Sequence, residues 1–557
     1  MNVISQPGST QPPIWHPGRG LRRALCLALL SALLGGALPV VAQQAAPQPD
    51  AVAMPQATGA TTRFPILGFE VTGDVPLTAA QINAVLDSFI GEGSLITLQQ
   101  ATGELENAFR LAGYELHRVS LPPQDLGGVV KLEVVKFALG KITVEGNERF
   151  TETNVRASLP ELQEGQAPNF RILAVQTAIA NENPAKQVQV SLKESDEADK
   201  IDVRLVLKES DPLSLSLSLS NTGSDSTGNN RLSVVASHAN LWGLDHQASL
   251  AYTTSPERIK EVTQLGLNYR IPLYRMGGVV GLSYTQSDVV GSFGAFTSTG
   301  AGSTFGANYS HYLEPEGGKR RYLTVGLDQK NFNVSQINGV ASPGQLDRVS
   351  RPLTLGYTVR TEADKAAWGY NVELAANMSG GRGNDLTAYR SEDPRVGTVD
   401  WTLLRASANY SGALAAGWLW SARAQLQYSG DVLISGEQFG IGGATSVRGT
   451  GERPLAADSG LFSTVELSSS ELAPGVRALG FVDGGWLHNN SGGVNPNKPD
   501  NDQLVSAGLG LRYASGRFAL STDWARVVTG SVLPFVPGSG IPQSGDQKIH
   551  LNVSARF

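Results

Sequence analysis

The stretch LSLSLSL, residues 213–219, places a leucine at every second position. Successive side chains of a β-strand point to opposite faces, so this alternation predicts a strand with one leucine face and one serine face. The same period of two recurs throughout residues 213–557, as in WLWSARAQLQY (418–428). Sixteen such strands are predicted, beginning near residues 213, 231, 246, 261, 277, 302, 321, 349, 367, 400, 418, 461, 475, 503, 517 and 547.

The connections between these strands indicate a membrane barrel rather than the alternative, a soluble β-sandwich. Short connections, such as 415–417 and 514–516, alternate with long ones, such as 379–399 and 429–460. Outer-membrane barrels show this pattern because their periplasmic turns are tight and their outward loops are free to grow. The last strand, KIHLNVSARF, carries an apolar face that ends in Phe557. Since every backbone amide in lipid needs a partner, we expect a closed transmembrane β-barrel of sixteen antiparallel strands over residues 213–557.

Two copies of a small βααββ module precede the barrel, at residues 64–137 and 138–209. In the first, apolar residues at helical spacing predict one helix over 78–90 and a second over 97–112. We expect Thr97 and Gln100 to form a capping box at the start of the second helix. The repeated order of elements predicts two α+β domains of one kind.

The first 42 residues are typical of an export signal, with arginines before an apolar stretch and a small-residue cleavage site. The apolar stretch is too short to cross a bilayer, which argues against the alternative of a membrane anchor. Residues 43–63 are rich in Pro, Ala and Gln and predict a flexible leader. The only cysteine, Cys26, lies in the signal, so the mature chain is expected to lack thiol chemistry and disulfides.

Composition and motifs exclude several other functions. With 44 basic and 50 acidic residues and no basic stripe, the chain is not expected to bind nucleic acid. ADSG (457–460) has no histidine assigned to it, and GIGG lacks the strand-to-helix context of a nucleotide site. The seven histidines show no metal-ligand spacing. We therefore expect no catalytic activity, no cofactor and no metal.

One long outward loop, 429–460, contains an arginine in the glycine-rich run GIGGATSVRGTGERPLAADSG (440–460). A candidate partner lies in GFVDGGW (480–486), where Phe481, Asp483 and Gly485 share one face of a strand. A carboxylate is penalised on the lipid face, so Asp483 should face the lumen, where Gly485 leaves room for an incoming loop. These residues predict a loop folded into the barrel with Arg448 paired to Asp483. The alternative is that Arg448 is solvated, as Arg453 is expected to be.

SVRG (446–449), which includes Val447 and Gly449, together with GFxDxG, sixteen strands, two βααββ modules and a terminal Phe resembles the TpsB transporters of two-partner secretion. These are the haemolysin and filamentous-haemagglutinin exporters of the outer-membrane superfamily that joins POTRA domains to a barrel. The resemblance covers nearly all of the mature chain. One departure is Thr450, since the family usually has an aromatic residue after VRG. The leader is also short for a barrel-plugging helix.

The resemblance implies a passive exporter in the bacterial outer membrane that takes one large exoprotein of the TpsA type from the periplasm to the cell surface. Its POTRA domains would bind the partner, with a groove near residues 163–182 and the candidate contacts Asn169, Phe170, Leu173 and Gln176. Phe557 would serve as a signal to the barrel assembly machinery, which would insert the barrel into lipid. A barrel-assembly insertase of the same superfamily, a general porin and an enzyme are the alternatives.

Overall fold

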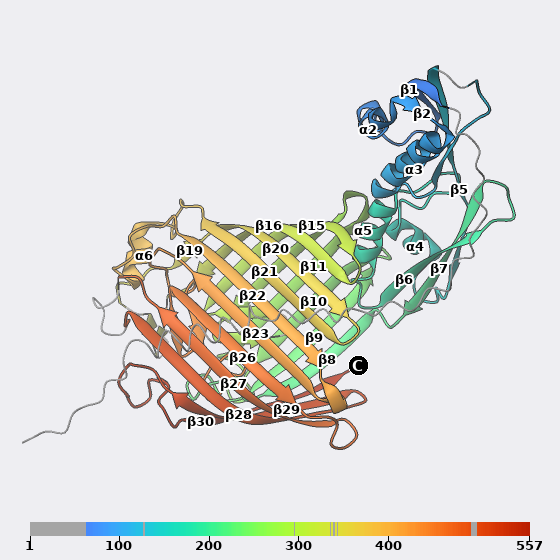
Figure 1. The fold of residues 1–557 in the computed structure, drawn as a ribbon. Coiled ribbons are helices and arrows are strands. Elements are labelled where there is room, and N and C mark those ends of the chain that lie inside the picture. The colour runs from blue at the N-terminus through green and yellow to red at the C-terminus, as the bar shows by residue number, and fades with distance from the viewer. Residues whose placement is uncertain are drawn as a thin grey trace, which may run out of the picture. The chain divides into compact units, whose positions relative to one another are not determined.

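The computed structural model describes residues 63–125, 128–293, 296–334, 336–337, 340–341, 343–491 and 498–557. The expected export signal and all but the last residue of the expected leader lie outside these ranges. The described part begins with two α+β modules and continues as a β-barrel, as the colours of Figure 1 show along the chain.

The first module folds as a four-stranded sheet with helices packed on one face. Its strands have the order β2-β1-β4-β3, with β1 parallel to β4. Alternate residues of β1 and β4, such as Ile66 and Leu132, are buried against Leu98, Leu105 and Phe109 of α3. The elements are β1 (Phe64–Gly73), α2 (Ala79–Leu86), the 3-10 turn η1 (Asp87–Phe89), β2 (Gly91–Gly93), α3 (Leu95–Leu111), β3 (His117–Ser120) and β4 (Gly128–Lys136).

The start of α3 corrects one prediction from the sequence. Ser94, not Thr97, is the N-cap, and Thr97 occupies the third helical position of the capping box. The Ser94 backbone N–H donates to Thr97 Oγ1 at 3.1 Å, and the Thr97 N–H donates to Ser94 Oγ at 3.5 Å. Two hydroxyl residues three apart can each serve as cap or as partner, and here the upstream one caps the helix. The short strand β2 just before it was not predicted.

The second module has the same order of elements without the extra strand. Its sheet has the order β5-β7-β6, with β5 parallel to β7 and β6 antiparallel to it. This order makes β6 an edge strand, which faces α5 across the groove described below. The elements are β5 (Ala138–Glu145), α4 (Glu152–Ser158), α5 (Phe170–Ala180), β6 (Lys186–Glu194) and β7 (Lys200–Glu209).

A closed barrel of sixteen antiparallel strands follows, as the sequence predicts. The last strand pairs with the first, Val553 opposite Leu219, which closes the sheet. Each strand begins within two residues of its expected position. The strands are β8 (Leu213–Ser220), β9 (Arg231–Leu241), β10 (His246–Thr254), β11 (Thr263–Leu273), β12 (Gly278–Ser287), β15 (Gly302–Glu316), β16 (Lys319–Phe332), β19 (Arg348–Ser350) with β20 (Pro352–Ala363) as one interrupted strand, β21 (Ala366–Asn377), β22 (Thr402–Ala413), β23 (Leu419–Tyr428), β26 (Ser459–Ser468), β27 (Val476–His488), β28 (Asn501–Ser515), β29 (Phe518–Thr529) and β30 (Gln547–Arg556).

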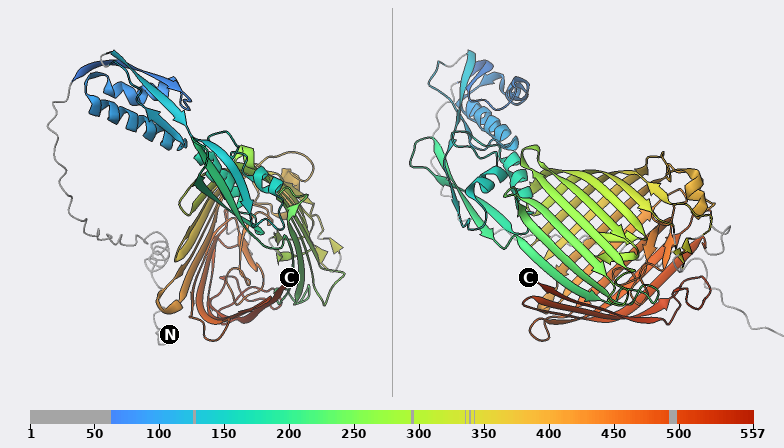
Figure 2. Two further views of the ribbon diagram at one scale, coloured as in Figure 1. Left: turned by 90° about the vertical axis from the view of Figure 1, so that its right-hand side faces the viewer. Right: turned by 180° about the vertical axis from the view of Figure 1, so that it is seen from behind.

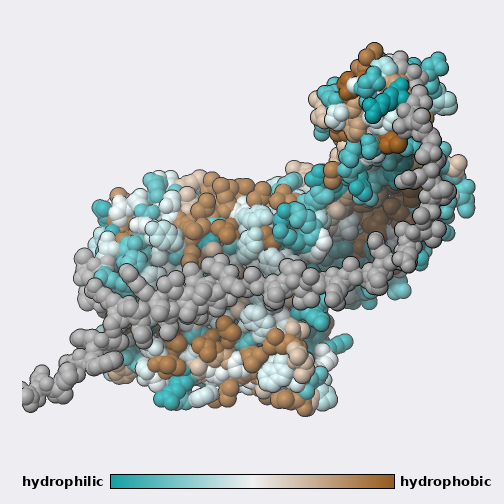
Figure 3. All heavy atoms as spheres, viewed as in Figure 1, coloured by the Kyte–Doolittle hydropathy of each residue, from teal (hydrophilic) through white to brown (hydrophobic). Residues whose placement is uncertain are grey.

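The two faces of the barrel wall differ as a membrane barrel requires. The leucines of β8 and the apolar residues Ile549, Leu551 and Val553 of β30 are exposed on the outside. Figure 3 shows apolar residues gathered on the outer surface of the barrel. Buried and half-buried polar side chains, such as Asp483, point inward. The outside therefore suits lipid and the inside suits water or a polar chain.

Shorter elements lie in the connections between barrel strands. The left view of Figure 2 looks into the ring of strands, with connecting segments inside it. The most important of them is the hairpin of β24 and β25, which belongs to the loop 429–460. The elements are η2 (Tyr274–Met276), β13 (Val290–Phe293), β14 (Phe296–Thr299), β17 (Gln336–Ile337), β18 (Val340–Ala341), α6 (Leu386–Glu392), η3 (Ala415–Gly417), β24 (Phe439–Ile441) and β25 (Leu455–Ala457).

Candidate functional site

The loop that joins β23 to β26 folds back into the barrel lumen. Its β24–β25 hairpin leads to a tip, residues 442–454, in which Gly442, Gly443 and Gly449 adopt positive φ angles of 105°, 103° and 94°. These angles are unfavourable for residues with a side chain, so glycine is what allows the tip to turn tightly. The tip then presents Arg448 to the wall of the barrel.

Arg448 and Asp483 form a bidentate ion pair inside the barrel. Arg448 Nε donates to Asp483 Oδ2, and Nη2 donates to Oδ1, both at 2.8 Å. The Arg448 backbone N–H also donates to Oδ2, at 3.0 Å. Only 4% of Arg448 and none of Asp483 is exposed. Charge-assisted, bidentate geometry of this kind fixes both the position and the orientation of a guanidinium group.

Two further carboxylates face the same guanidinium. Nη1 of Arg448 lies 2.7 Å from Glu466 Oε1 and 3.3 Å from Asp523 Oδ2. Asp523 is shared with Arg512, whose Nη1 lies 2.6 Å from Oδ1. Of these two guanidinium groups, Arg448 contacts all three carboxylates and Arg512 contacts Asp523. Asp483 was predicted from the sequence, but Glu466 and Asp523 were not.

The remaining contacts of Arg448 define how its side chain lies. Phe481, two residues before Asp483 on the same face of β27, lies under the guanidinium, with Arg448 Cζ 3.3 Å from the ring centroid. Such stacking adds a cation–π attraction to the ion pair. Thr464, directly opposite Asp483 on β26, donates to Asp483 Oδ1 at 2.6 Å and accepts from Arg448 Nη2 at 3.2 Å.

The residues on either side of Arg448 also contact the wall. Gly449 donates its backbone N–H to Nε2 of His550 on β30 at 3.0 Å. Val447 is fully buried in an apolar cluster that joins the loop to the wall. Gly485 gives the loop the space that it occupies, because a β-carbon there would lie 2.7 Å from Ile441 Cδ1 and 3.3 Å from Val447 Cγ2. The cluster contains Ile441, Val447, Leu455, Ala457, Phe462, Leu487, Leu504 and Val527.

Thr450 and Arg453 show how the tip is stabilised internally. The Thr450 hydroxyl accepts from the Gly443 N–H at 3.0 Å and can donate to the Val447 carbonyl at 3.2 Å. It therefore ties the two sides of the turn by hydrogen bonds. Arg453 is not simply solvated, as the sequence suggested, because its Nη2 donates to the carbonyls of Ser435 and Gln438 at 2.9 and 2.6 Å.

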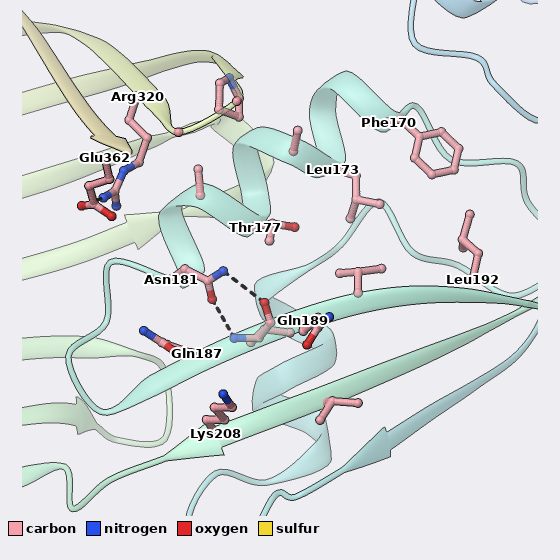
Figure 4. A pocket seen from close by; sticks show the side chains of 18 residues that line it. Phe170, Leu173, Thr177, Asn181, Gln187, Gln189, Leu192, Lys208, Arg320 and Glu362 are labelled. Atoms are coloured by element: carbon pink, nitrogen blue, oxygen red, sulfur yellow. Dashed lines mark hydrogen bonds and ion pairs between the residues drawn. The ribbon is translucent and has the colours of Figure 1, made fainter. Parts of the chain in front are cut away.

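A second candidate site is a groove of about 980 Å³ between α5 and β6 of the second module, with apolar side chains from α5 on one side and polar ones such as Gln187, Gln189 and Lys208 from the sheet on the other (Figure 4). Phe170 and Leu173 line the groove, as do Ala174, Thr177 and Leu192. One end is bounded by residues of the β15–β16 turn and by Arg320 and Glu362, which form an ion pair.

The other two residues expected to bind a partner in this module do not line the groove. Asn169 caps α5, with its Oδ1 accepting from the N–H groups of Arg171 and Ile172, and its amide donates to the Ala112 carbonyl. Gln176 is 2% exposed and accepts from the Glu161 N–H at 3.0 Å. Gln176 therefore serves the structure of the second module, and Asn169 both caps α5 and joins it to the end of α3 in the first module.

Phe557 lies beside the closing pair of strands. Its backbone N–H donates to the Leu215 carbonyl at 2.8 Å, and its carbonyl accepts from the Leu215 N–H at 3.0 Å. The Arg517 guanidinium lies 5.5 Å from its ring centroid. These contacts extend the pairing of β30 with β8 to the last residue.

Within the described ranges, no group of three or more His, Cys, Asp or Glu side chains is placed to hold a metal ion.

None of the helices in the described part of the chain is long and apolar enough to cross a membrane.

Two α+β modules, a closed barrel and an arginine-tipped loop in the lumen define the class of outer-membrane proteins that join POTRA domains to a barrel. A family model described as haemolysin secretion/activation protein ShlB/FhaC/HecB matches residues 199–513, and one described as POTRA domain, ShlB-type, matches residues 64–136. The chain therefore belongs to the ShlB/FhaC/HecB family. It is an outer-membrane transporter with POTRA domains in the periplasm.

Named relatives agree with this assignment. The chain is 26% identical over 472 residues to the outer membrane transporter CdiB of Escherichia coli, which covers 81% of this chain and 77% of the relative. It is 26% identical over 412 residues to CdiB of Dickeya dadantii, with 71% of each chain covered. The solved structure of CdiB from Escherichia coli superposes with a TM-score of 0.69 at 22% identity, covering 98% of this chain and 100% of that one. That of CdiB from Acinetobacter baumannii gives 0.66 at 17% identity, covering 96% and 98%; at these identities the likeness concerns the fold.

Proposed function

We propose that this transporter performs two-partner secretion: it binds one large exoprotein at its POTRA domains and passes the extended chain through the barrel to the cell surface. Family membership supports the class of function, and the groove on the second module supports the step of recognition. The relatives named above are outer membrane transporters. We also propose that the barrel assembly machinery inserts the barrel into the outer membrane.

The observation that carries recognition is a groove beside the edge strand β6, at which the backbone N–H and carbonyl of Val188 pair with the Asn181 side chain and the rest of the edge lies beyond that pair. β6 is the outer strand of its sheet, so one side of its backbone is unpaired within that sheet. An extended peptide can add to such an edge through its main chain while its alternate side chains enter a neighbouring pocket. Phe170, Leu173 and Ala174 of α5 supply the apolar wall of that pocket. This arrangement suits an extended chain that places apolar side chains against α5 and polar ones toward Gln187, Gln189 and Lys208.

The lumen supports the second step. The loop that fills part of it is fastened by ion pairs and apolar contacts rather than by covalent bonds. Its displacement would leave a passage lined by inward polar side chains. We propose that the Arg448–Asp483 pair holds the loop in place between export events and that Val447, Gly449, Phe481 and Gly485 position that pair. Folding of the partner outside the cell, or its capture at the periplasmic face, would supply the direction of transport.

The proposal is tested by deleting the gene in the bacterium that carries it and comparing the proteins of the culture medium by mass spectrometry. We expect one large exoprotein to disappear and to return when the gene is restored. Unchanged medium would contradict two-partner secretion.

Recognition is tested with the same exoprotein and two substitutions on α5. Thr177→Arg places a bulky cation in the groove, whereas Ile172→Arg changes an exposed residue of the same helix that does not line the groove. We expect release to fall with Thr177→Arg and to persist with Ile172→Arg. Equal release by both variants would remove the groove from the proposal, provided that both are present in the membrane at equal amounts.

A further inference from the structure

A second buried carboxylate holds the loop where it leaves the barrel rim. Glu437, two residues before β24, is 1% exposed. Its Oε2 lies 3.0 Å from Lys330 Nζ and 3.2 Å from Arg405 Nη2, and its Oε1 accepts from Ser350 Oγ at 2.7 Å. A buried carboxylate with two cations and a hydroxyl has its charge balanced and both of its oxygens satisfied.

Asp458 is another buried carboxylate that holds the loop, after the strand of the hairpin that returns to the barrel wall. It follows β25 directly and is fully buried. Its Oδ1 accepts from the Leu433 N–H at 2.9 Å and from Gln438 Nε2 at 3.1 Å, and its Oδ2 accepts from the Asn490 N–H at 2.8 Å. We call Glu437 and Asp458, with these partners, the rim anchor.

One wall residue joins both ends of the hairpin. Gln427 of β23 donates its amide to the Glu437 carbonyl at 2.9 Å and to the Asp458 carbonyl at 3.1 Å. Both ends of the hairpin are therefore hydrogen-bonded to the same residue of β23.

Apolar packing surrounds the rim anchor. The loop residues 432–434 are buried against the outward connection that contains α6, including Tyr389 and Trp401, which are both fully buried. This cluster consists of Ala375, Tyr389, Val396, Val399, Trp401, Leu403, Val432, Leu433 and Ile434. To move the rim anchor, the protein would have to open this cluster and expose two carboxylates together.

The rim anchor and the tip of the loop bind different parts of the wall. Glu437 contacts side chains of β16, β19 and β22, whereas Arg448 contacts side chains of β26, β27 and β29. Between the two attachments lie the positive-φ glycines Gly442 and Gly443 and the short hairpin. The loop therefore crosses the lumen from one set of strands to another.

We propose that Glu437 and Asp458 are positioning residues that stay engaged during export, so that residues 439–457 alone move as a hairpin hinged at the rim anchor. The inference rests on the proposed passage of an exoprotein through the lumen. When the Arg448 contacts break, the tip of the loop is free to move. The buried carboxylates keep both ends of the hairpin at the rim, so the hairpin can bind the wall again afterwards. Arg448 thus governs whether the loop opens, and Glu437 governs where it pivots.

Disulfide tethers distinguish the moving part from the fixed part, because the only cysteine of the chain lies in the expected export signal. One pair, Ile441→Cys with Gly485→Cys, joins the hairpin to β27, where a β-carbon at 485 would touch Ile441. The other pair, Phe332→Cys with Gly436→Cys, joins the loop at the rim anchor to β16, where a β-carbon at 436 would lie 2.2 to 2.6 Å from Phe332 ring atoms. Each oxidised variant is compared with itself after reduction.

We expect the 441–485 tether to abolish release of the exoprotein until it is reduced, and the 332–436 tether to leave release unchanged. Loss of release with the oxidised rim tether, or normal release with the oxidised hairpin tether, would overturn the inference. Because the reduced variants must release the exoprotein that gene deletion abolishes, a failure of the proposed function would show itself first and separately.

A second measurement addresses Glu437 itself. Glu437→Gln leaves Lys330 and Arg405 without their shared carboxylate, so the 332–436 disulfide should form less completely in this background. Glu466→Gln, which alters a partner of the tip, is the matched control and should leave the rim disulfide unchanged. Equal formation of the 332–436 disulfide in the unsubstituted background, with Glu437→Gln and with Glu466→Gln would remove Glu437 from the rim anchor.

Discussion

Substitution of Arg448 by alanine is expected to be among the most costly single changes in the barrel. Both partners of the Arg448–Asp483 pair are buried, and removing one partner of such a pair costs about 3–5 kcal/mol. That range corresponds to roughly a hundredfold to several thousandfold change in an equilibrium constant. The change also removes the one guanidinium that forms ion pairs with Glu466, Asp483 and Asp523 together, and leaves Arg512 paired with Asp523 alone.

The two partners are not expected to be equivalent. Without Arg448, Asp483 keeps the hydrogen bond from Thr464, but its negative charge is unpaired. Without Asp483, Arg448 still faces Glu466 and Asp523. We therefore expect Arg448→Ala to lower the free energy of unfolding more than Asp483→Ala, and the double variant to lower it by less than the sum of the two, as is typical of residues in direct contact.

The assay is urea unfolding of the refolded chain in detergent micelles, followed by tryptophan fluorescence, with release of the exoprotein measured in parallel. Arg258→Ala is the control, because Arg258 forms an exposed pair with Glu261, and such pairs contribute about 0–1 kcal/mol. Strictly additive effects, or an Arg448→Ala variant as stable as the control, would refute the reasoning from burial and charge.

Three further predictions concern the first module and the contacts that hold the loop 429–460 in the lumen. Gly485→Val should clash with Ile441, cost about 1–3 kcal/mol and reduce release, whereas Gly484→Val, which has only Ser463 Oγ near at 3.9 Å, should not. Thr450→Val should leave the Gly443 N–H unpaired and cost about 1–3 kcal/mol, with Thr450→Ser close to the parent in the same urea assay. Burial lowers the pKa of His117 below its ordinary value of 6.5, so the unfolded state takes up a proton first as pH falls. The stability of the first module should therefore decline as pH falls from the unfolded pKa towards the folded one, and hydrogen exchange in α3 should report this loss in the parent but not in His117→Phe.

The barrel could be predicted because its signal is local. Each strand shows alternation with period two in its own sequence, and lipid requires the strands to close into a barrel. The first residues of the sixteen strands can therefore be predicted without knowledge of tertiary contacts. Asp483 was identifiable for a similar reason, since its spacing from Phe481 and Gly485 sets its face and the cost of a charge in lipid sets its direction.

The other members of the site depend on contacts that the sequence does not mark. Glu437 meets Lys330, which is 107 positions away in the chain, and in sequence it resembles any solvated loop carboxylate. Helical spacing likewise could not tell that Phe170 and Leu173 face the groove while Gln176 faces the core of the module. Thr450 replaces an expected aromatic side chain with hydrogen bonds, which only the path of the tip reveals.

The central claim is that an exoprotein passes through the lumen of this barrel, and neighbouring residues of β23 test it most directly. Gln425 faces the lumen and is exposed there, whereas Leu426 pairs with Leu461 on the lipid face. A photo-crosslinking amino acid is placed at each position in turn, and cells are irradiated while the exoprotein is being exported. The account predicts a crosslink to the exoprotein from position 425 and none from position 426. Continued release with a crosslink only from 426, or from neither position, would contradict it.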